Sequence, residues 1–179
     1  MKKIMILLVL VLTLSFSSML SADNFGKQNY AGANPFGLLI HYYSGDFGHF
    51  LDSEGSAEVN IPIGYFSYGD YTYFSLGGKY RMYKDKNAEG IFYGGGLTYS
   101  HYGWDFHWAY SDNESLSWNV FTPLVEGGYR WSWANGWTVA PSLELGYDIS
   151  SYEDADWSAP DYGDGGISWG LNLGIGYMF

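Results

Sequence analysis

The sequence has 179 residues, a formal net charge of −11 and no cysteine. The excess of acidic side chains argues against nucleic-acid binding, because a protein needs lysine and arginine to neutralise phosphates. The lack of cysteine excludes disulfide bonds and a cysteine-linked lipid anchor within these residues.

The chain begins with a predicted export signal, residues 1–22. Lys2 and Lys3 make a positively charged start, residues 4–14 are almost continuously apolar, and Ala22 is a small residue typical of a signal-peptidase site. We expect cleavage after Ala22, which would leave residues 23–179 as one domain. That domain contains no run of roughly 18 apolar residues, the minimum for a membrane-spanning helix.

Beyond the leader, apolar and polar residues alternate in successive segments, which predicts β-strands because neighbouring side chains of a strand point to opposite faces. After a polar lead at 23–32, the expected strands are 34–43, 46–52, 56–67, 72–83, 91–102, one within 116–133, 137–148 and 167–179. Turns are expected at Ser44-Gly45, Gly69-Asp70 and the hairpin pair Asn135-Gly136. The segment 46–52 is the weakest strand, because it is short and has no clear apolar face. Residues 104–115 and 149–166 are expected to be longer loops.

The last strand shows the alternation most clearly. Odd positions from Ile167 to Phe179 are large and apolar or aromatic, whereas even positions are small or polar, with Met178 the exception. The strand is longer than the roughly 9–11 residues that cross a bilayer at a tilt. Only helices and closed barrels satisfy their backbone polar groups in lipid. We therefore expect an all-β protein, a single eight-stranded antiparallel transmembrane β-barrel with up-and-down meander connections.

Two sets of residues resemble known bacterial proteins. Leu173, Ile175, Tyr177 and the terminal Phe179 resemble the C-terminal signal by which outer-membrane barrels are recognised for assembly. The motifs N-P-F-G-L-L at 34–39, K-Y-R-M-Y at 79–83 and G-I-F-Y-G-G-G-L-T-Y at 90–99 resemble small outer-membrane barrels of the opacity and OmpA-type superfamily. The resemblance implies a Gram-negative outer membrane, folding by the barrel-assembly machinery, and contact with outer-membrane lipid and lipopolysaccharide. It carries over no catalytic or cofactor-binding residue.

Charged side chains are predicted on the inward face of several strands. They are Glu58, Lys79, Arg81, Glu126, Arg130 and Glu144. An eight-stranded barrel is only wide enough for side chains to fill it, and buried charges must be paired, so we expect a lumenal network of ion pairs. Within it, Arg130 is expected to couple to Glu126, which lies two same-face positions earlier. The alternative is a narrow or gated ion path through the same charges.

Two pairs of residues have the side chains of catalytic dyads. Asp105 and His107 share one face of an extended segment and resemble the pair of omptin proteases, but the second acidic pair of those enzymes is missing. His41 and Ser44 are the residue types of outer-membrane lipid A deacylases, but a spacing of three places them on opposite faces of a strand. We therefore assign no catalytic residue and no cofactor.

The segment 149–166 concentrates acidic residues without a lysine or arginine. They are Glu153, Asp154, Asp156, Asp161 and Asp164. Their oxygens could hold divalent cations, which could bridge the loop to lipopolysaccharide, although the spacing does not match a known calcium loop. The other interpretation is a solvated loop, and we assign no metal site.

Aromatic residues near strand ends predict two girdles at the membrane interfaces. They are Tyr42, Tyr65, Tyr83, Trp118, Trp131, Trp137, Tyr147 and Trp169. Taken together, these patterns favour a non-enzymatic barrel with a structural or surface-interaction role, exerted through acidic and aromatic external loops. A narrow pore is the second hypothesis, and a lipid-modifying or proteolytic enzyme is the third.

Overall fold

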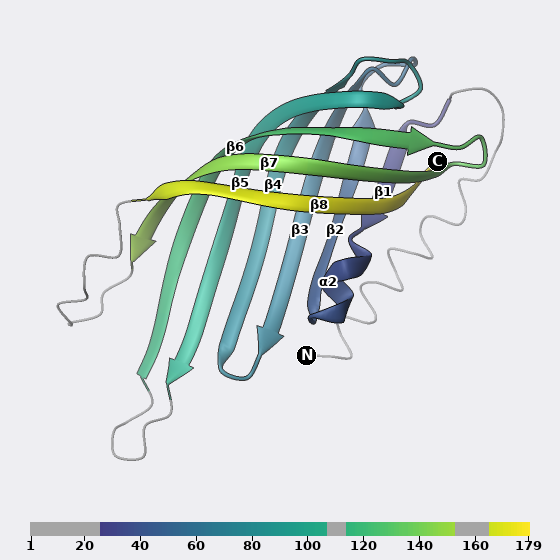
Figure 1. The fold of residues 1–179 in the computed structure, drawn as a ribbon. Helices are drawn as coiled ribbons and strands as arrows, with labels where there is room; N and C mark the ends of the chain where they lie inside the picture. Colours follow the sequence, from purple (N-terminus) through teal and green to yellow (C-terminus); the bar gives the residue numbers. More distant parts are fainter. Residues whose placement is uncertain (1–25, 107–113, 153–164) are drawn as a thin grey trace.

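The computed structural model describes residues 26–106, 114–152 and 165–179, which form a closed antiparallel barrel (Figure 1). Its elements are β1 (Asn29–Ala33), α2 (Pro35–Leu39), β2 (Tyr42–Phe50), β3 (Ala57–Tyr68), β4 (Tyr71–Tyr83), β5 (Gly90–Phe106), β6 (Glu114–Ser132), β7 (Trp137–Tyr152) and β8 (Gly166–Met178). Each strand pairs with the next, and β1 pairs with β8, so the predicted eight-stranded meander is confirmed. No helix in these described ranges is long and apolar enough to span a membrane.

The start of the barrel differs from the prediction. Residues 34–43 do not form the first strand, because β1 lies earlier, in the segment expected to be a polar lead, and α2 follows it. Asn34 caps this short helix by accepting a hydrogen bond from the Phe36 amide (3.0 Å), and Pro35 occupies its first turn. An Asn-Pro pair is a common helix start, since proline needs no N–H partner there. The alternation in this segment therefore predicted the wrong element.

The weak segment 46–52 lies largely in a regular strand, β2, which also contains the predicted turn Ser44-Gly45. Its inward positions are polar or small at Ser44, Asp46 and Gly48, and aromatic at Phe50, which is buried. The pattern lacked an apolar face because two outward positions of β2 are Gly45 and His49 rather than large apolar residues. The residues that turn the chain here are 51–56, held by the Leu51 amide bonded to the Ala57 carbonyl at 2.9 Å.

Strands β5, β6 and β7 are longer than expected. β5 continues to Phe106, β6 begins at Glu114 and β7 continues to Tyr152, so part of each predicted loop is strand. Figure 1 shows these strands extending furthest from the end of the barrel that carries the C-terminus. Residues 107–113 and 153–164, with the acidic cluster, lie outside the described residues, as do residues 1–25 with the predicted export signal.

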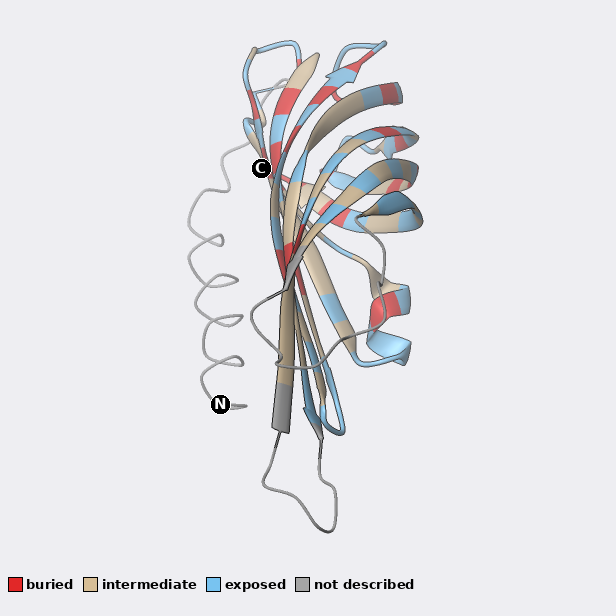
Figure 2. Cartoon of the chain, turned by 90° about the vertical axis from the view of Figure 1, so that its left-hand side faces the viewer, coloured by how far each residue is buried: buried red, intermediate tan, exposed pale blue. Residues whose placement is uncertain are grey.

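The two faces of the wall follow the predicted alternation from β3 to β8. Apolar side chains face outward and remain exposed, among them Ile61, Leu76, Tyr93, Leu145 and Trp169. The inward face is buried or half-buried and carries polar as well as apolar groups. Figure 2 shows most of the fully buried residues toward the end of the barrel with the short turns. The molecule therefore has an apolar exterior around a partly polar lumen, the reverse of a water-soluble domain.

The wall closes over only part of its height. β1 pairs with β8 from Tyr30 opposite Met178 to Ala33 opposite Ile175. Among the described residues, Gly166–Gly174 of β8 pair only with β7, and α2 lies against both β2 and β8 where β1 would have continued. We call this region, bounded by residues 34–43 and 166–174, the β8–β2 seam.

Candidate functional site in the barrel lumen

Arg81 is the centre of the charged groups in the lumen. Its Nε and Nη2 donate to the two oxygens of Glu126 at 2.5 and 3.2 Å, respectively. Its Nη1 lies 3.3 Å from Asp46 Oδ2 and 3.5 Å from Glu58 Oε1. β4 thus contacts β2, β3 and β6 through one guanidinium, so these ion pairs join strands that are not all neighbours in the sheet.

Lys79 lies two residues earlier on the same inward face and joins two carboxylates. Glu126 and Glu144 are direct partners in the β6–β7 register, which places two negative charges side by side. The ammonium of Lys79 lies 3.4 Å from Glu126 and 2.5 Å from Glu144. Glu144 also accepts a hydrogen bond from the Asn172 amide of β8 at 2.6 Å. The cation therefore offsets a repulsion that the strand register creates.

Arg130 is fully buried nearer the C-terminal end of the barrel. Its Nη1 lies 3.1 Å from Glu58 Oε2, and its guanidinium lies over the rings of Tyr30 and Tyr83, 4.3 and 5.0 Å from their centroids. The Tyr83 hydroxyl donates to the same Glu58. The predicted pairing of Arg130 with Glu126 is therefore wrong: Glu126 turns to Arg81 and Lys79, and Arg130 reaches across the lumen to β3.

The structure brings all six predicted charged side chains into one connected cluster, and it adds the uncharged Asn60 and a further carboxylate, Asp46, which the pattern missed. Asp46 contacts Arg81, and Asn60 donates to Asp46 at 2.8 Å and to Glu58 at 3.0 Å. Alternation with Glu58 places Asn60 on the inward face of β3, whereas no face was predicted for the segment that contains Asp46. The signal that could have found it is the small-polar alternation Ser44, Asp46, Gly48. The resulting lumenal charge cluster contains four carboxylates and three cations.

Aromatic layers bound this cluster on both sides. Toward the C-terminal end, the buried residues Tyr30, Phe50, Tyr83, Phe92 and Met178 pack together. Toward the opposite end, a ladder of inward rings runs Tyr42, Tyr73, Tyr102 and Trp118, with centroid separations of 5.9, 4.9 and 5.0 Å. Three residues expected in the outer girdles, Tyr42, Tyr83 and Trp118, are therefore inside the barrel, whereas Trp131, Trp137, Tyr147 and Trp169 face outward as expected.

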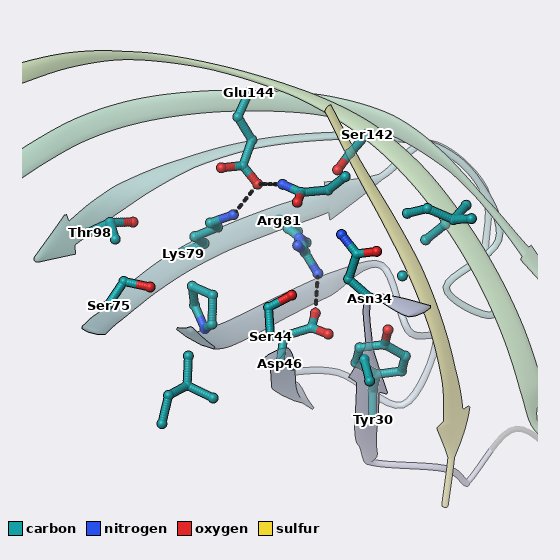
Figure 3. A pocket seen from close by; sticks show the side chains of 18 of the residues that line it. Tyr30, Asn34, Ser44, Asp46, Ser75, Lys79, Arg81, Thr98, Ser142 and Glu144 are labelled. Atoms are coloured by element: carbon teal, nitrogen blue, oxygen red, sulfur yellow. Dashed lines mark hydrogen bonds and ion pairs between the residues drawn. The ribbon is translucent and has the colours of Figure 1, made fainter. Parts of the chain in front are cut away.

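Between the charge cluster and the aromatic ladder lies a cavity of about 160 Å³ (Figure 3). Figure 3 shows Lys79 with Glu144 and Arg81 with Asp46 on its wall, and Ser44, Ser75, Thr98 and Ser142 around it. Asn34 at the start of α2 and Asn172 of β8 also line it, so the cavity reaches the β8–β2 seam. The uncharged side chains of this wall can form hydrogen bonds, and its charged side chains take part in ion pairs with one another or with Glu58.

The residues expected for catalysis do not come together in the described part of the chain. His41 is exposed after α2 with a positive φ of 61°, whereas Ser44 lines the cavity. Asp105 is exposed at the end of β5, and His107 lies outside the described residues. Within the described ranges no group of three or more His, Cys, Asp or Glu side chains could hold a metal ion. The acidic cluster at 153–164 lies outside those ranges.

The residues that resemble an assembly signal close the barrel. Phe179 and Asn29 exchange two backbone hydrogen bonds of 2.9 Å. Tyr177 packs on Trp137 with ring centroids 5.8 Å apart, and Ile175 is the last residue of β8 that pairs with β1. Leu173 lies one step further, at the edge of the cavity. Ile175, Tyr177 and Phe179 therefore lie where the wall is closed, and Leu173 lies at the β8–β2 seam.

No protein-family model and no curated protein sequence matches this chain. A solved structure with which it shares similarity is the N-terminal β-barrel domain of Pseudomonas aeruginosa OprF. The two share 14% sequence identity with a TM-score of 0.48, over 84% of this chain and 94% of that one. The fold assignment for this chain stands on its own strand pairing.

Proposed function

We propose that this protein is a small, non-enzymatic β-barrel of the bacterial outer membrane, with a structural or surface-interaction role. The observation that carries the proposal is the inversion of polarity across the wall. Exposed apolar side chains surround the barrel, while fully buried charges such as Glu58 and Arg130 lie within it. A closed barrel is the β-structure that satisfies its backbone groups in lipid, and an apolar outer band suits the hydrocarbon phase.

The filled lumen supports a structural role over a transport role. The charge cluster is paired across the barrel, and aromatic layers lie on both sides of it. Such a lumen rigidifies the wall and leaves little room for a solute. Lipopolysaccharide is the proposed surface partner, through divalent cations held by the acidic residues of 153–164, and the barrel-assembly machinery is the proposed partner in folding.

The location can be tested by expressing the full chain in a Gram-negative host. We expect the protein in the outer-membrane fraction, soluble only with detergent, and migrating differently on gels before and after boiling. Recovery from the periplasm without detergent would contradict the proposal. The surface role is tested by binding of the folded barrel to lipopolysaccharide vesicles with and without Ca²⁺, for the native chain and for a variant with the acidic residues of 153–164 replaced by amides.

A narrow pore is a second candidate, favoured by the polar cavity beside a cluster in which carboxylates outnumber cations. Reconstituted in planar bilayers, the native chain should show no large, steady conductance if the lumen is structural. Stable cation-selective currents would instead support the pore, since an excess of carboxylates favours cations.

A further inference from the structure

The β8–β2 seam is open because of a single residue, Pro35. Asn29 and Phe179 exchange both backbone hydrogen bonds, so every second residue of β1 from Asn29 onward bonds to β8. In that register Ala33 faces Ile175, and Pro35 would face Leu173. Proline has no N–H to donate and is excluded from a strand position that requires one. β1 therefore ends, and the chain turns into α2.

The edge of β8 that this leaves is polar in its backbone and apolar in its side chains. The same register directs the N–H and C=O groups of Leu173, Leu171, Trp169 and Ile167 toward the seam, where no strand of the described chain pairs with them. Unsatisfied backbone groups in hydrocarbon cost several kcal/mol each, and open sheet edges are not found facing lipid. A polar group that reaches this edge at Leu173, the edge residue that also lines the cavity, would therefore be stabilised there.

The rim of the seam is apolar on both sides. On β8, Ile167, Trp169 and Leu171 are 83%, 71% and 73% exposed, among the most exposed large apolar residues of the described strands. Across the gap, α2 and the residue after it present exposed Phe36, Leu38, Leu39 and Ile40. An acyl chain lying between these two rows would contact apolar groups on each side.

Behind this rim the cavity is polar and small. A cavity of about 160 Å³ has room for several water-sized groups, which suits a small polar head such as glycerol. The charged side chains on its wall are already in ion pairs, Lys79 with Glu144, Arg81 with Asp46 and Arg130 with Glu58, and the buried Arg130 nitrogens keep unused donors that a hydroxyl oxygen can accept from. A charged head would have to displace one of these partners, whereas hydroxyl groups can bond to Ser44, Ser142 and Asn172 without doing so.

We propose that the β8–β2 seam is a lateral binding site for a single-chain amphiphile with a small, uncharged, hydroxyl-bearing head. The head occupies the lumenal cavity beside Asn172, and the acyl chain lies in the seam between α2 and β8. At the entrance, the polar end of the ligand meets the backbone of Leu173, the edge residue that lines the cavity. This inference rests on the proposed membrane location, because the acyl chain is drawn from the lipid phase.

The test is photolabelling of the folded barrel in phospholipid nanodiscs. The probe is a 1-monoacylglycerol with a diazirine on its acyl chain, and the sites of labelling are mapped by mass spectrometry. We expect saturable labelling confined to residues 34–41 and 167–173, and competition by unlabelled monoacylglycerol. Competitors of equal chain length with an anionic phosphate head or a cationic ammonium head should fail.

Two glycines offer matched variants. A Cβ added at Gly170 or at Gly78 meets no atom within 4 Å, so both positions accept a larger side chain. Gly170 shares the inward face of β8 with Asn172, and Gly78 faces outward on β4. Gly170→Phe should abolish saturable labelling, and Gly78→Phe should retain it.

The outcomes separate the two proposals. Failure of the native chain to insert into nanodiscs would overturn the outer-membrane function and this site with it. Insertion followed by labelling spread evenly around the barrel would overturn the site alone, whatever the variants show. Equal competition by a charged head would overturn the assignment of an uncharged ligand.

Discussion

If β1 continued past the pair Ala33–Ile175, Pro35 would lie opposite Leu173, at a position where a residue of β1 donates its backbone N–H to β8. Asn34, immediately before it, caps α2 in place of continuing the strand. Pro35 thus sets where the wall closes. Between Ala33 and the end of the barrel that carries the C-terminus, β1 pairs with β8, and toward the opposite end the two strands no longer pair.

Restoring an N–H at this position should lengthen β1. In a Pro35→Val variant, the new amide can donate to the Leu173 carbonyl, and a β-branched residue favours the strand. We expect slower hydrogen exchange at the amides of Leu173 and Leu171, measured by mass spectrometry or NMR in detergent. The β3–β4 amides provide the control and should not change. Unaltered protection at the β8 edge would show that α2 forms for another reason.

Removing the guanidinium of Arg130 should strongly destabilise the barrel. Glu58 is completely buried, and Arg130→Met takes away the cation that lies 3.1 Å from it. Breaking a buried pair costs about 3–5 kcal/mol, a large part of a typical stability of about 5–15 kcal/mol. Urea unfolding in detergent, followed by tryptophan fluorescence, measures the loss.

A double-mutant cycle measures how much of this loss of stability comes from the interaction between Arg130 and Glu58. Arg130→Met with Glu58→Gln should be less harmful than the two single changes added together, by about 1–3 kcal/mol. The exposed pair Lys86–Glu54, with side chains 70% and 58% exposed, is the control and should couple by about 0–1 kcal/mol. Absence of coupling between Arg130 and Glu58 would indicate that water screens these charges and would favour the pore.

The turn between β2 and β3 should give the barrel a defined acid sensitivity. Asp52 accepts hydrogen bonds from the Ser56 amide (3.0 Å) and hydroxyl (2.7 Å), and from the amides of Glu54 and Ala57. These bonds, those from Ser56 foremost, hold the Asp52 pKa below its ordinary value of 3.8. A lowered folded-state pKa stabilises the fold above the ordinary value, and this contribution is lost as the pH falls through the lowered value.

Asp52→Asn should therefore flatten the dependence of unfolding free energy on pH below about 3.8, because the amide does not titrate. At neutral pH the variant should be less stable than the native barrel, since a neutral oxygen is the weaker acceptor. Urea titrations at several pH values measure both effects. Parallel pH curves for the two proteins would contradict the assignment.

Gly96 of β5 lies so close to the backbone of β4 that a larger residue there should destabilise the barrel. A Cβ at Gly96 would lie 2.2 Å from the Gly78 carbonyl oxygen, which belongs to the backbone of β4 and cannot move aside. We expect Gly96→Ala to destabilise the barrel by about 1–3 kcal/mol through overpacking. Gly78→Ala, whose Cβ meets open space, is the control. Equal unfolding midpoints for the two variants would show that the sheet relaxes.

The sequence alone predicted most of this fold, because alternation with a period of two is a local property of a strand. The inward positions of Glu58, Lys79 and Glu126 and the outward positions of Leu145 and Trp169 followed from that period. The same rule was wrong at 34–43, where an apolar alternation coincided with a helix cap. There the Asn-Pro pair, which ends β1 and begins α2, was the stronger local signal.

Only the tertiary structure decided which charges meet. Arg130 contacts Glu58 across the lumen, three strands away, and Arg81 joins Asp46 to Glu126. Such contacts depend on the stagger between strands and on the curvature of the closed wall, which no single strand encodes. The open seam is likewise a property of the whole barrel. Pro35 can be read from the sequence, but Leu173, the residue it would face in a longer β1, lies at the far end of the chain, and the register that relates the two exists only when the barrel closes.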